Sequence, residues 1–464
     1  MKIIILGAGQ VGASVADNLA SEENDITLVD TDPEQLARIR ERLEIRSVVG
    51  NAASPSVLRE AGSEDADLLI ALTQSDQTNL CACRIAKAMF NVPTRIARLR
   101  STDYIDYPEL LSDENFAVDF SICPEQIVTD YIQRLIDFPE ALQVLNFADD
   151  RVSMVGMRAY EGGLLVGQPL KSLQVHLPDM EVRVVAIYRN DKPIKPDGAT
   201  LIVPGDEVFF LAASEHIRTA MSVLRSSDRP MKRIMIAGGG NIGFRLARSL
   251  QQDHIVKVIE ISKKRATLLA AELAETLVLK GDTTDEKLLE NEGIDEVDLF
   301  AALTNREEDN FMSAALAKRM GARRTLALIN RRSYIDLVQS GPIDIAISPA
   351  QASIGSLLTH VRRGDVVAVH SLRRGASEAL EIVARGTARD SKVVGRKIEK
   401  ISFPDGVYIG AIVRGLESED RLDEVIIPHH DTVIEQDDHV IIFCAHKALV
   451  RKVEKMFQVG FTFL

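Results

Sequence analysis

The sequence predicts an α/β protein built as a tandem duplication, in which a Rossmann-like doubly wound parallel sheet domain is followed by a small α+β domain, twice over. Three observations support this prediction. Apolar strand-like runs alternate with amphipathic helical stretches, a glycine-rich motif opens each half, and short β-like runs fill the later part of each half. Strands that alternate with helices indicate βαβ units and therefore a parallel sheet.

Each half begins with an apolar strand that runs into G-x-G-x-x-G: KIIILGAGQVG at 2–12 and KRIMIAGGGNIG at 232–243. In this motif the first glycine permits a tight turn, the second lets backbone N–H groups approach a pyrophosphate, and the third lets the helix pack close to the sheet. The motif therefore predicts a nucleotide site in each half. Its candidate residues are Gly7, Ala8, Gly9, Gln10, Val11 and Gly12, and then Gly238, Gly240, Asn241 and Gly243.

The repeat extends far beyond the glycine motifs. GNAA at 50–53 answers GDTT at 281–284, and ALTQSDQTNL at 71–80 answers ALTNREEDNF at 302–311. The nearly constant spacing of these matches indicates an internal duplication with small loop insertions.

The expected elements follow from the apolar runs. In the first half the strands are IIIL, ITLVD, RSVVG, DLLIALT and TRIARL, and the helices include VGASVADNLASEE and DPEQLARIRERLE. VSMVGMRA, VRVVAIYRN and DEVFFLAAS form the β-rich part, which VVAVHSL, GVYIGAIVRG and DDHVIIFCA repeat in the second half. We expect nucleotide-binding domains at 1–135 and 231–362, small domains at 136–227 and 363–464, and a polar linker, RSSDRP, at 225–230.

A carboxylate ends the second strand of each half, Asp30 after ITLV and Glu260 after VKVI. A carboxylate at this position accepts the ribose hydroxyls of a nucleotide and repels a 2′-phosphate. Lys263, Lys264 and Arg265 follow Glu260 and could tolerate such a phosphate, but we interpret them as a solvated first helical turn.

Further polar residues lie at the predicted carboxyl ends of strands, where ligands bind in sheets of this kind. These candidates are Asn51, Thr73, Asp282 and Thr304. Each could equally be a helix N-cap. Arg98 and Arg100 leave the fifth strand, where an arginine could pair with a phosphate or be a surface charge; Leu328 replaces Arg98 in the second half.

Composition excludes several classes of protein. The net charge of −13 argues against nucleic-acid binding. The four cysteines show neither metal-ligand spacing nor a disulfide framework, which indicates a reduced, cytoplasmic compartment and no metal site. The apolar start MKIII leads directly into a glycine loop, so we expect no signal peptide. No apolar run approaches the roughly 20 residues that span a bilayer.

The first predicted nucleotide domain contains no histidine that could act as a catalytic acid or base. Hydride transfer needs a general acid or base near the nicotinamide. All nine histidines lie at or beyond residue 176, and no other catalytic motif is present. We therefore expect a nucleotide that is bound and not consumed, with a soluble NAD-dependent oxidoreductase as the alternative.

The whole chain resembles the TrkA family, the RCK-type regulatory subunits of bacterial Trk potassium-uptake systems. The resemblance rests on IIILGAGQVG, VVGNAA, ALTQSDQTN, IARLR and HVRRGDVVAVHSLRRG in their duplicated order. It implies a protein without enzymatic activity that binds NAD or NADH, and ATP or ADP, to control ion flow. The implied partners are a TrkH- or TrkG-type integral membrane potassium-translocating subunit and further copies of the chain, as a homodimer or homotetramer ring. The implied location is the cytoplasm, peripherally bound to the inner face of the cell inner membrane.

Overall fold

The computed structural model describes residues 1–20, 24–101, 104, 106–190, 192–224, 229–331, 341, 343–361, 365–372, 377–416 and 423–459. Most of the expected linker at 225–230 and the two Arg-Arg pairs of HVRRGDVVAVHSLRRG lie outside these residues. The chain divides into two compact units, Met1–Asp130 with Arg233–Leu357, and Tyr131–Lys232 with Leu358–Leu464. Each unit combines a segment of the first half with the corresponding segment of the second half.

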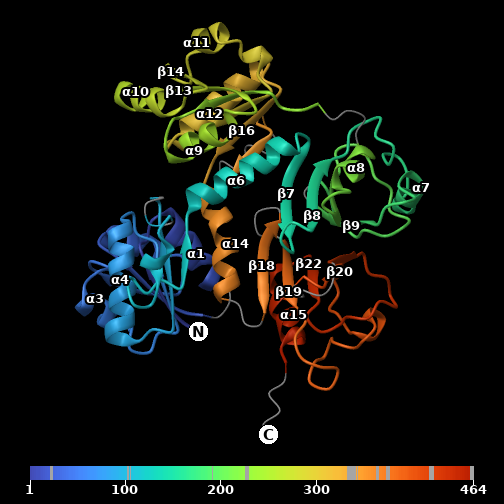
Figure 1. The fold of residues 1–464 in the computed structure, drawn as a ribbon, viewed down its shortest axis with the longest axis horizontal. Helices are drawn as coiled ribbons and strands as arrows, with labels where there is room; N and C mark the ends of the chain where they lie inside the picture. The colour runs from blue at the N-terminus through green and yellow to red at the C-terminus, as the bar shows by residue number, and fades with distance from the viewer. Residues whose placement is uncertain are drawn as a thin grey trace. The chain divides into compact units, whose positions relative to one another are not determined.

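The first unit contains two parallel six-stranded sheets of identical topology. In Figure 1 the first belongs to the blue part of the chain and the second to the part that runs from green to orange. The first has the order β3-β2-β1-β4-β5-β6. Its strands are β1 (Lys2–Leu6), β2 (Asp25–Asp30), β3 (Arg46–Val49), β4 (Leu68–Ala71), β5 (Thr94–Arg98) and β6 (Phe120–Ile122). Its helices are α1 (Gln10–Ala20), α2 (Pro33–Arg40), α3 (Pro55–Glu60), α4 (Asp76–Phe90) and the short η1 (Pro108–Leu111). This strand order is that of a Rossmann fold, with the topological switch between β1 and β4.

The second sheet repeats this order as β14-β13-β12-β15-β16-β17. Its strands are β12 (Arg233–Ala237), β13 (Ile255–Glu260), β14 (Thr276–Lys280), β15 (Leu299–Ala302), β16 (Arg324–Leu328) and β17 (Ile345–Ile347). Its helices are α9 (Asn241–Leu250), α10 (Lys263–Glu272), α11 (Glu286–Asn291), η3 (Ile294–Glu296) and α12 (Glu307–Arg319). The expected Rossmann-like duplication is therefore confirmed.

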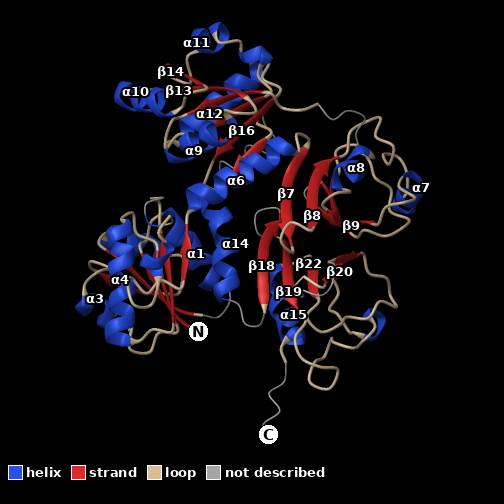
Figure 2. Ribbon diagram, viewed as in Figure 1, coloured by secondary structure: helices blue, strands red, loops and turns tan. Residues whose placement is uncertain are grey.

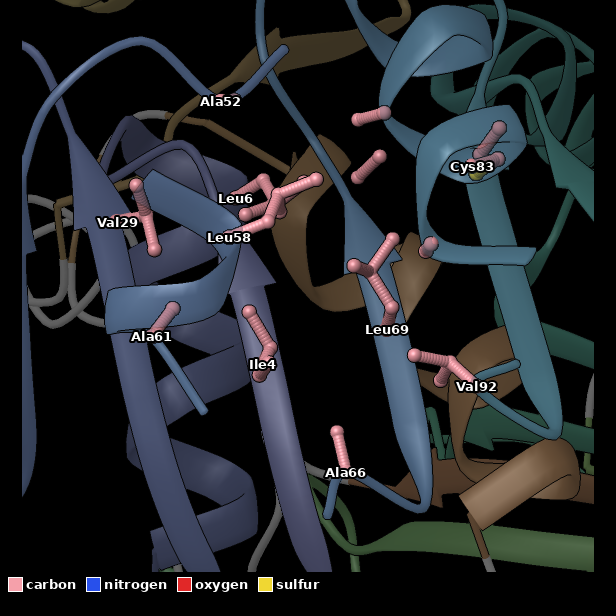
Figure 3. Packing of buried hydrophobic residues seen from close by; sticks show 14 of the residues in the cluster. Ile4, Leu6, Val29, Ala52, Leu58, Ala61, Ala66, Leu69, Cys83 and Val92 are labelled. Atoms are coloured by element: carbon pink, nitrogen blue, oxygen red, sulfur yellow. The ribbon is translucent and has the colours of Figure 1, made fainter. Parts of the chain in front are cut away.

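The central strands are buried along their whole length because helices cover both faces of each parallel sheet (Figure 2). Figure 3 shows Ile4 of β1 and Leu69 of β4 in one cluster with Leu58 of α3 and Cys83 of α4. Burial raises the pKa of the Cys83 thiol to about 12, so this cysteine stays neutral and acts as a core residue.

The second unit contains two antiparallel five-stranded sheets, also of matching order: β10-β9-β11-β8-β7 and β18-β19-β22-β20-β21. The first sheet is made of β7 (Ala141–Phe147), β8 (Val152–Arg158), β9 (Val182–Arg189), β10 (Lys192–Ile194) and β11 (Glu207–Ala213). The second is made of β18 (Val366–Leu372), β19 (Ser377–Val383), β20 (Val407–Arg414), β21 (Glu424–Ile426) and β22 (His439–Cys444). The short helices are η2 (Leu170–Ser172), α7 (Leu173–His176), α8 (Ile217–Ser222), η5 (Ile398–Lys400), η6 (Lys447–Leu449) and α15 (Val450–Phe457).

The two antiparallel sheets share one hydrophobic core. It contains Phe147 and Phe209 from the first half together with Leu372 and Phe443 from the second. Polar contacts reinforce it, since the guanidinium of Arg183 donates to the carbonyl of Ile409 at 2.8 Å. The small domains of the two halves are therefore packed together as a pair.

Two of the three boundaries between the units lie within helices. Asp130 lies within α6 (Pro124–Asp137), and Leu357 lies within α14 (Pro349–Val361). In each half, one helix thus carries the chain out of the parallel-sheet unit and into the antiparallel-sheet unit. None of the helices that the structure describes is long and apolar enough to cross a membrane.

One histidine makes the second unit sensitive to pH. The Nε2 atom of His370 lies 3.1 Å from the carbonyl oxygen of Asn146, and its ring meets Phe147 edge-on. Burial lowers the pKa of His370 from 6.5 to about 4. Below pH 6.5 His370 is therefore protonated in the unfolded chain but stays neutral in the folded chain. The free energy of unfolding consequently falls as the pH falls toward 4.

We predict that His370→Gln, which retains a donor for Asn146, reduces the loss of melting temperature between pH 7.5 and pH 5. Thermal denaturation of the full chain at both pH values measures this loss. His430→Gln, at a solvent-exposed position, serves as the control and should follow the unmodified chain. Equal losses for His370→Gln and the unmodified chain would contradict the assignment.

Candidate functional site

The structure brings the predicted residues of each half to one edge of a parallel sheet, at the carboxyl ends of the strands. In the first half these residues are Gly7, Ala8, Gly9, Gln10, Val11 and Gly12 after β1, Asp30 on β2, Asn51 after β3, Thr73 after β4, Arg98 on β5 and Arg100 beyond it. In the second half they are Gly238, Gly240, Asn241 and Gly243 after β12, Glu260 on β13, Asp282 after β14 and Thr304 after β15.

The three motif glycines of the first half meet different steric requirements. Gly7 has a φ of +103°, which side chains rarely adopt. A Cβ atom at Gly12 would lie 1.9 Å from the carbonyl oxygen of Gly7, so only glycine lets α1 approach its loop. A Cβ atom at Gly9 would meet nothing within 4 Å. Gly7 and Gly12 therefore allow the helix to pack on the loop, whereas Gly9, the second glycine of the motif, leaves open space in front of the loop.

The second half repeats this arrangement closely. A Cβ atom at Gly243 would lie 2.0 Å from the oxygen of Gly238, and one at Gly240 would meet nothing within 4 Å. Both loops therefore leave the same open space at the N-terminus of the following helix, where backbone N–H groups and the helix dipole favour an anion.

The strand-end carboxylates hold the glycine loops. Asp30 accepts hydrogen bonds from the backbone N–H groups of Ala8 at 2.6 Å and Asp32 at 2.9 Å. Glu260 accepts the equivalent bonds from Gly239 at 2.9 Å and Ser262 at 2.8 Å. Each carboxylate therefore connects the end of its strand to the loop. The sequence had predicted only a ribose-binding role for these two residues.

A side chain from the next helix binds each loop from the same side. Gln35 donates from Nε2 to the carbonyl oxygen of Ala8 at 2.7 Å, and Arg265 donates from Nε to that of Gly239 at 2.7 Å. The guanidinium of Arg265 also lies over the ring of Phe244, 5.6 Å from its centroid. Lys263 and Lys264 are exposed as interpreted, but for Arg265 the interpretation as a solvated residue is wrong.

Two buried asparagines that the sequence analysis missed connect neighbouring strand ends. Asn79 accepts from the backbone N–H and the hydroxyl of Thr73, at 3.0 and 2.7 Å, and donates to the carbonyl of Arg98 at 2.9 Å. Asn310 makes the same bonds to Thr304 and Leu328. The recurrence of N six residues after T in ALTQSDQTN and ALTNREEDN was the available signal.

None of the four polar strand-end candidates is a helix N-cap, so that alternative is wrong. The caps of α3, α4, α11 and α12 are Ser54, Ser75, Asp285 and Arg306. Asn51 and Asp282 lie in the preceding turns and accept from the N–H groups of Ala53 and Thr284, each at 2.9 Å. The N–H and hydroxyl of Thr284 hold the pKa of Asp282 below its usual value, so this carboxylate is ionised.

The two arginines at the end of β5 share a carboxylate. Glu125, which is 6% exposed, accepts from Arg98 at 3.0 Å and from Arg100 at 2.9 Å. Arg98 is therefore no simple surface charge. Its Nε atom is buried and has no hydrogen-bond partner among the residues that the structure describes. Asp76 positions the following chain by accepting the N–H groups of Arg100 and Ser101.

Within the first unit, residues of the first candidate site contact residues of the second half. Gln10, at the start of α1, donates to Glu307 at 3.4 Å and accepts from Asn330 at 3.1 Å, and both partners belong to the second half. In the reverse direction, Arg245 of α9 donates to the side chain of Gln126 at 2.8 Å and to the carbonyl of Arg100 at 2.9 Å.

No group of three or more His, Cys, Asp or Glu side chains in the described part of the chain is arranged to hold a metal ion.

Comparison with known proteins gives full-length matches. A family profile described as the TrkA-N domain matches residues 3–115 and 234–349, and one described as the TrkA-C domain matches 154–225 and 387–458. The chain is 54% identical over 463 residues to the Trk system potassium uptake protein TrkA of Halomonas elongata, covering 100% of both chains. It is 53% identical over 459 residues to the protein of that name from Vibrio alginolyticus, covering 99% of each.

Solved structures share the fold at low identity. The crystal structure of the GsuK RCK domain aligns with a TM-score of 0.62 and 17% identity, covering 98% of this chain and 94% of the other. The GsuK channel bound to NAD aligns with a TM-score of 0.61 and 15% identity, covering 98% and 78%.

The glycine geometry generates a prediction about stability. Gly12→Ala places a methyl group against the Gly7 carbonyl and should cost about 3 kcal/mol, the upper end of overpacking. Gly9→Ala faces open space and should cost at most about 1 kcal/mol, as for an alanine at a helix N-cap. Urea denaturation followed by circular dichroism measures both losses. Losses of equal size would contradict this division of roles.

Proposed function

The chain belongs to the TrkA family of potassium-uptake proteins, and on that premise we propose that it is the nucleotide-binding regulatory subunit of a Trk-type potassium-uptake system. The observation that carries this proposal is the pair of matching glycine loops. Each loop has open space at its second motif glycine, and a backbone N–H group of each loop donates to the carboxylate at the end of the second strand. The relatives are named as potassium-uptake proteins, so the chain is a transport subunit and not an oxidoreductase.

The ligands of the glycine loops are NAD or NADH, and ATP or ADP. In the first half Gly9 and the helix-start N–H groups would receive a pyrophosphate, and Asp30 would face the ribose. The buried, unpaired Nε of Arg98 suits a phosphate oxygen, with Arg100 beside it. At the second loop the nucleotide would contact the equivalent residues: Gly240, Asn241, Glu260, Asp282 and Thr304. This loop has no counterpart of Arg98, because the buried Leu328 takes that position. The NAD-bound GsuK channel, which has the same fold, supports a dinucleotide ligand.

The partner is a TrkH- or TrkG-type integral membrane potassium-translocating subunit, and the chain binds it at the inner face of the cell inner membrane as a homodimer or homotetramer ring. Family membership supports this assignment. The proposed domains 1–135, 136–227, 231–362 and 363–464 each contain one of the matched TrkA-N or TrkA-C segments.

Contacts between the halves suggest how a bound nucleotide would act. Gln10 lies at the anion-facing start of α1 and also contacts Glu307 and Asn330 of the second half. A ligand at the first loop would therefore strengthen or displace a contact between the two halves. A differential affinity worth about 1–3 kcal/mol between two arrangements is enough to regulate a coupled site.

We predict that Gly9→Ala removes NADH binding at the first loop while the chain remains folded, because the methyl group occupies the space that the pyrophosphate needs. Isothermal titration of the full chain should show the loss of one site. Gly198→Ala, at an exposed glycine of the second unit with ordinary φ, is the matched control. Unchanged stoichiometry and affinity in Gly9→Ala would contradict the first site.

The regulatory role is tested by affinity purification of the tagged chain from detergent-solubilised native membranes, with NADH, ATP or ADP added. We expect recovery of an integral membrane potassium transporter in amounts that depend on the nucleotide. Gly9→Ala should still recover the transporter but respond less to nucleotide. Recovery of no membrane transporter by the unmodified chain under any nucleotide would overturn the proposal.

A further inference from the structure

The two glycine loops differ in charge at the edge where the ribose of a nucleotide would lie. In the first half the segment 30–35 carries three carboxylates and no basic residue. In the second half the equivalent segment, 260–265, carries one carboxylate, Glu260, followed by Lys263, Lys264 and Arg265. In both halves the helix cap lies two residues after the strand-end carboxylate and that carboxylate binds the loop, so the charge of the side chains is the main difference.

The basic residues of the second half act against their own helix. Lys263, Lys264 and Arg265 form the first turn of α10, where the positive end of the helix dipole disfavours cations. The first half follows the usual rule, since Asp32 caps α2 and Glu34 lies in its first turn. A departure from a local preference that only one copy of a duplication shows is typical of a functional position.

Arg265 has a defined position. Its Nε atom donates to the carbonyl of Gly239 and its guanidinium carbon lies over the ring of Phe244, so Arg265 is held beside the second loop. Among the described residues its two Nη nitrogens have no hydrogen-bond partner, which leaves them available for a ligand. Gln35 makes the same bond to the first loop without a charge.

Glu260 stands where a carboxylate disfavours a 2′-phosphate, but the three cations that follow it outnumber its single charge. Each of its two carboxylate oxygens accepts a backbone N–H, from Gly239 and from Ser262. Together with Lys263, Lys264 and Arg265 the segment carries a net positive charge, whereas Asp30, in the same bonding arrangement, is followed by further carboxylates.

We propose that the second glycine loop binds a 2′-phosphorylated adenine dinucleotide, the chemical class of NADP and NADPH, whereas the first binds the unphosphorylated class. The inference rests on the proposed function, in which both loops bind adenine nucleotides. An arginine near the end of the second strand is the group that accommodates a 2′-phosphate in Rossmann folds, and Arg265 is placed there. The three carboxylates of the first segment repel the same phosphate.

The experiment isolates the second loop by using Gly9→Ala in the full chain and titrating it with NADPH and with NADH. We expect NADPH to bind this variant at least as tightly as NADH. In the complementary variant Gly240→Ala, only the first loop keeps its open ligand space. This variant should bind NADH at least about tenfold more tightly than NADPH.

Arg265→Gln and Gln35→Arg form a matched pair because each installs the other half's residue and retains a donor for the loop carbonyl. In the Gly9→Ala background, Arg265→Gln should weaken NADPH about tenfold and leave NADH unchanged, as expected for the loss of one charge-assisted contact. In the Gly240→Ala background, Gln35→Arg should narrow the preference for NADH.

The outcomes separate this inference from the proposed function. If Gly9→Ala binds NADH but not NADPH, or if Arg265→Gln leaves the ratio of the two affinities unchanged, the inference is overturned and the nucleotide-binding function stands. If the unmodified chain binds no adenine nucleotide at all, the proposed function itself fails.

Discussion

The contact on which the rest of the structure depends is the one between the Gly12 backbone and the carbonyl of Gly7, repeated between Gly243 and Gly238. Only the absence of a side chain lets the first helix of each half lie on the loop that precedes it. That close seating turns the helix N-terminus toward the carboxyl ends of the strands. Once the helix is seated, the carboxylate at the end of the second strand and the donor from the second helix bind the same loop from behind.

The remaining strand ends are connected by buried polar side chains. Asn79 joins the ends of β4 and β5, and Asn310 does the same for β15 and β16. Because both asparagines are buried, breaking one of these side-chain hydrogen bonds is costly: it would leave an unpaired polar group inside the protein. Hydrogen bonds therefore connect neighbouring strand ends at this edge of each sheet, and the contacts of Gln10 and Arg245 connect it to the other half.

Local pattern was sufficient to predict the parts of the fold that are continuous in sequence. The five apolar runs of the first half became β1 to β5. The pattern was clearest for the inner strands β1, β2 and β4, which are buried and apolar, whereas the edge strand β3 is largely exposed. β6 and β17 were missed because three residues carry too little pattern. β7 and β19 were missed although they are seven residues long, and their equivalents β18 and β8 were predicted, so comparison of the two halves would have found them. Glu125 and the pairing of like domains across the halves depend on contacts between residues far apart in sequence, which no local pattern encodes.

The core that the two small domains share has a consequence for assembly. Phe147 and Phe443 meet in one core although they come from different halves of a single polypeptide. In a dimer of separate chains such a core would form only when the protein concentration exceeds the dissociation constant of the dimer. Covalent linkage instead holds the two halves at an effective concentration of roughly millimolar or more. Pairing of the halves is therefore unimolecular and does not depend on how many copies a cell makes. Dilution separates one molecule from another, but it leaves every pair intact.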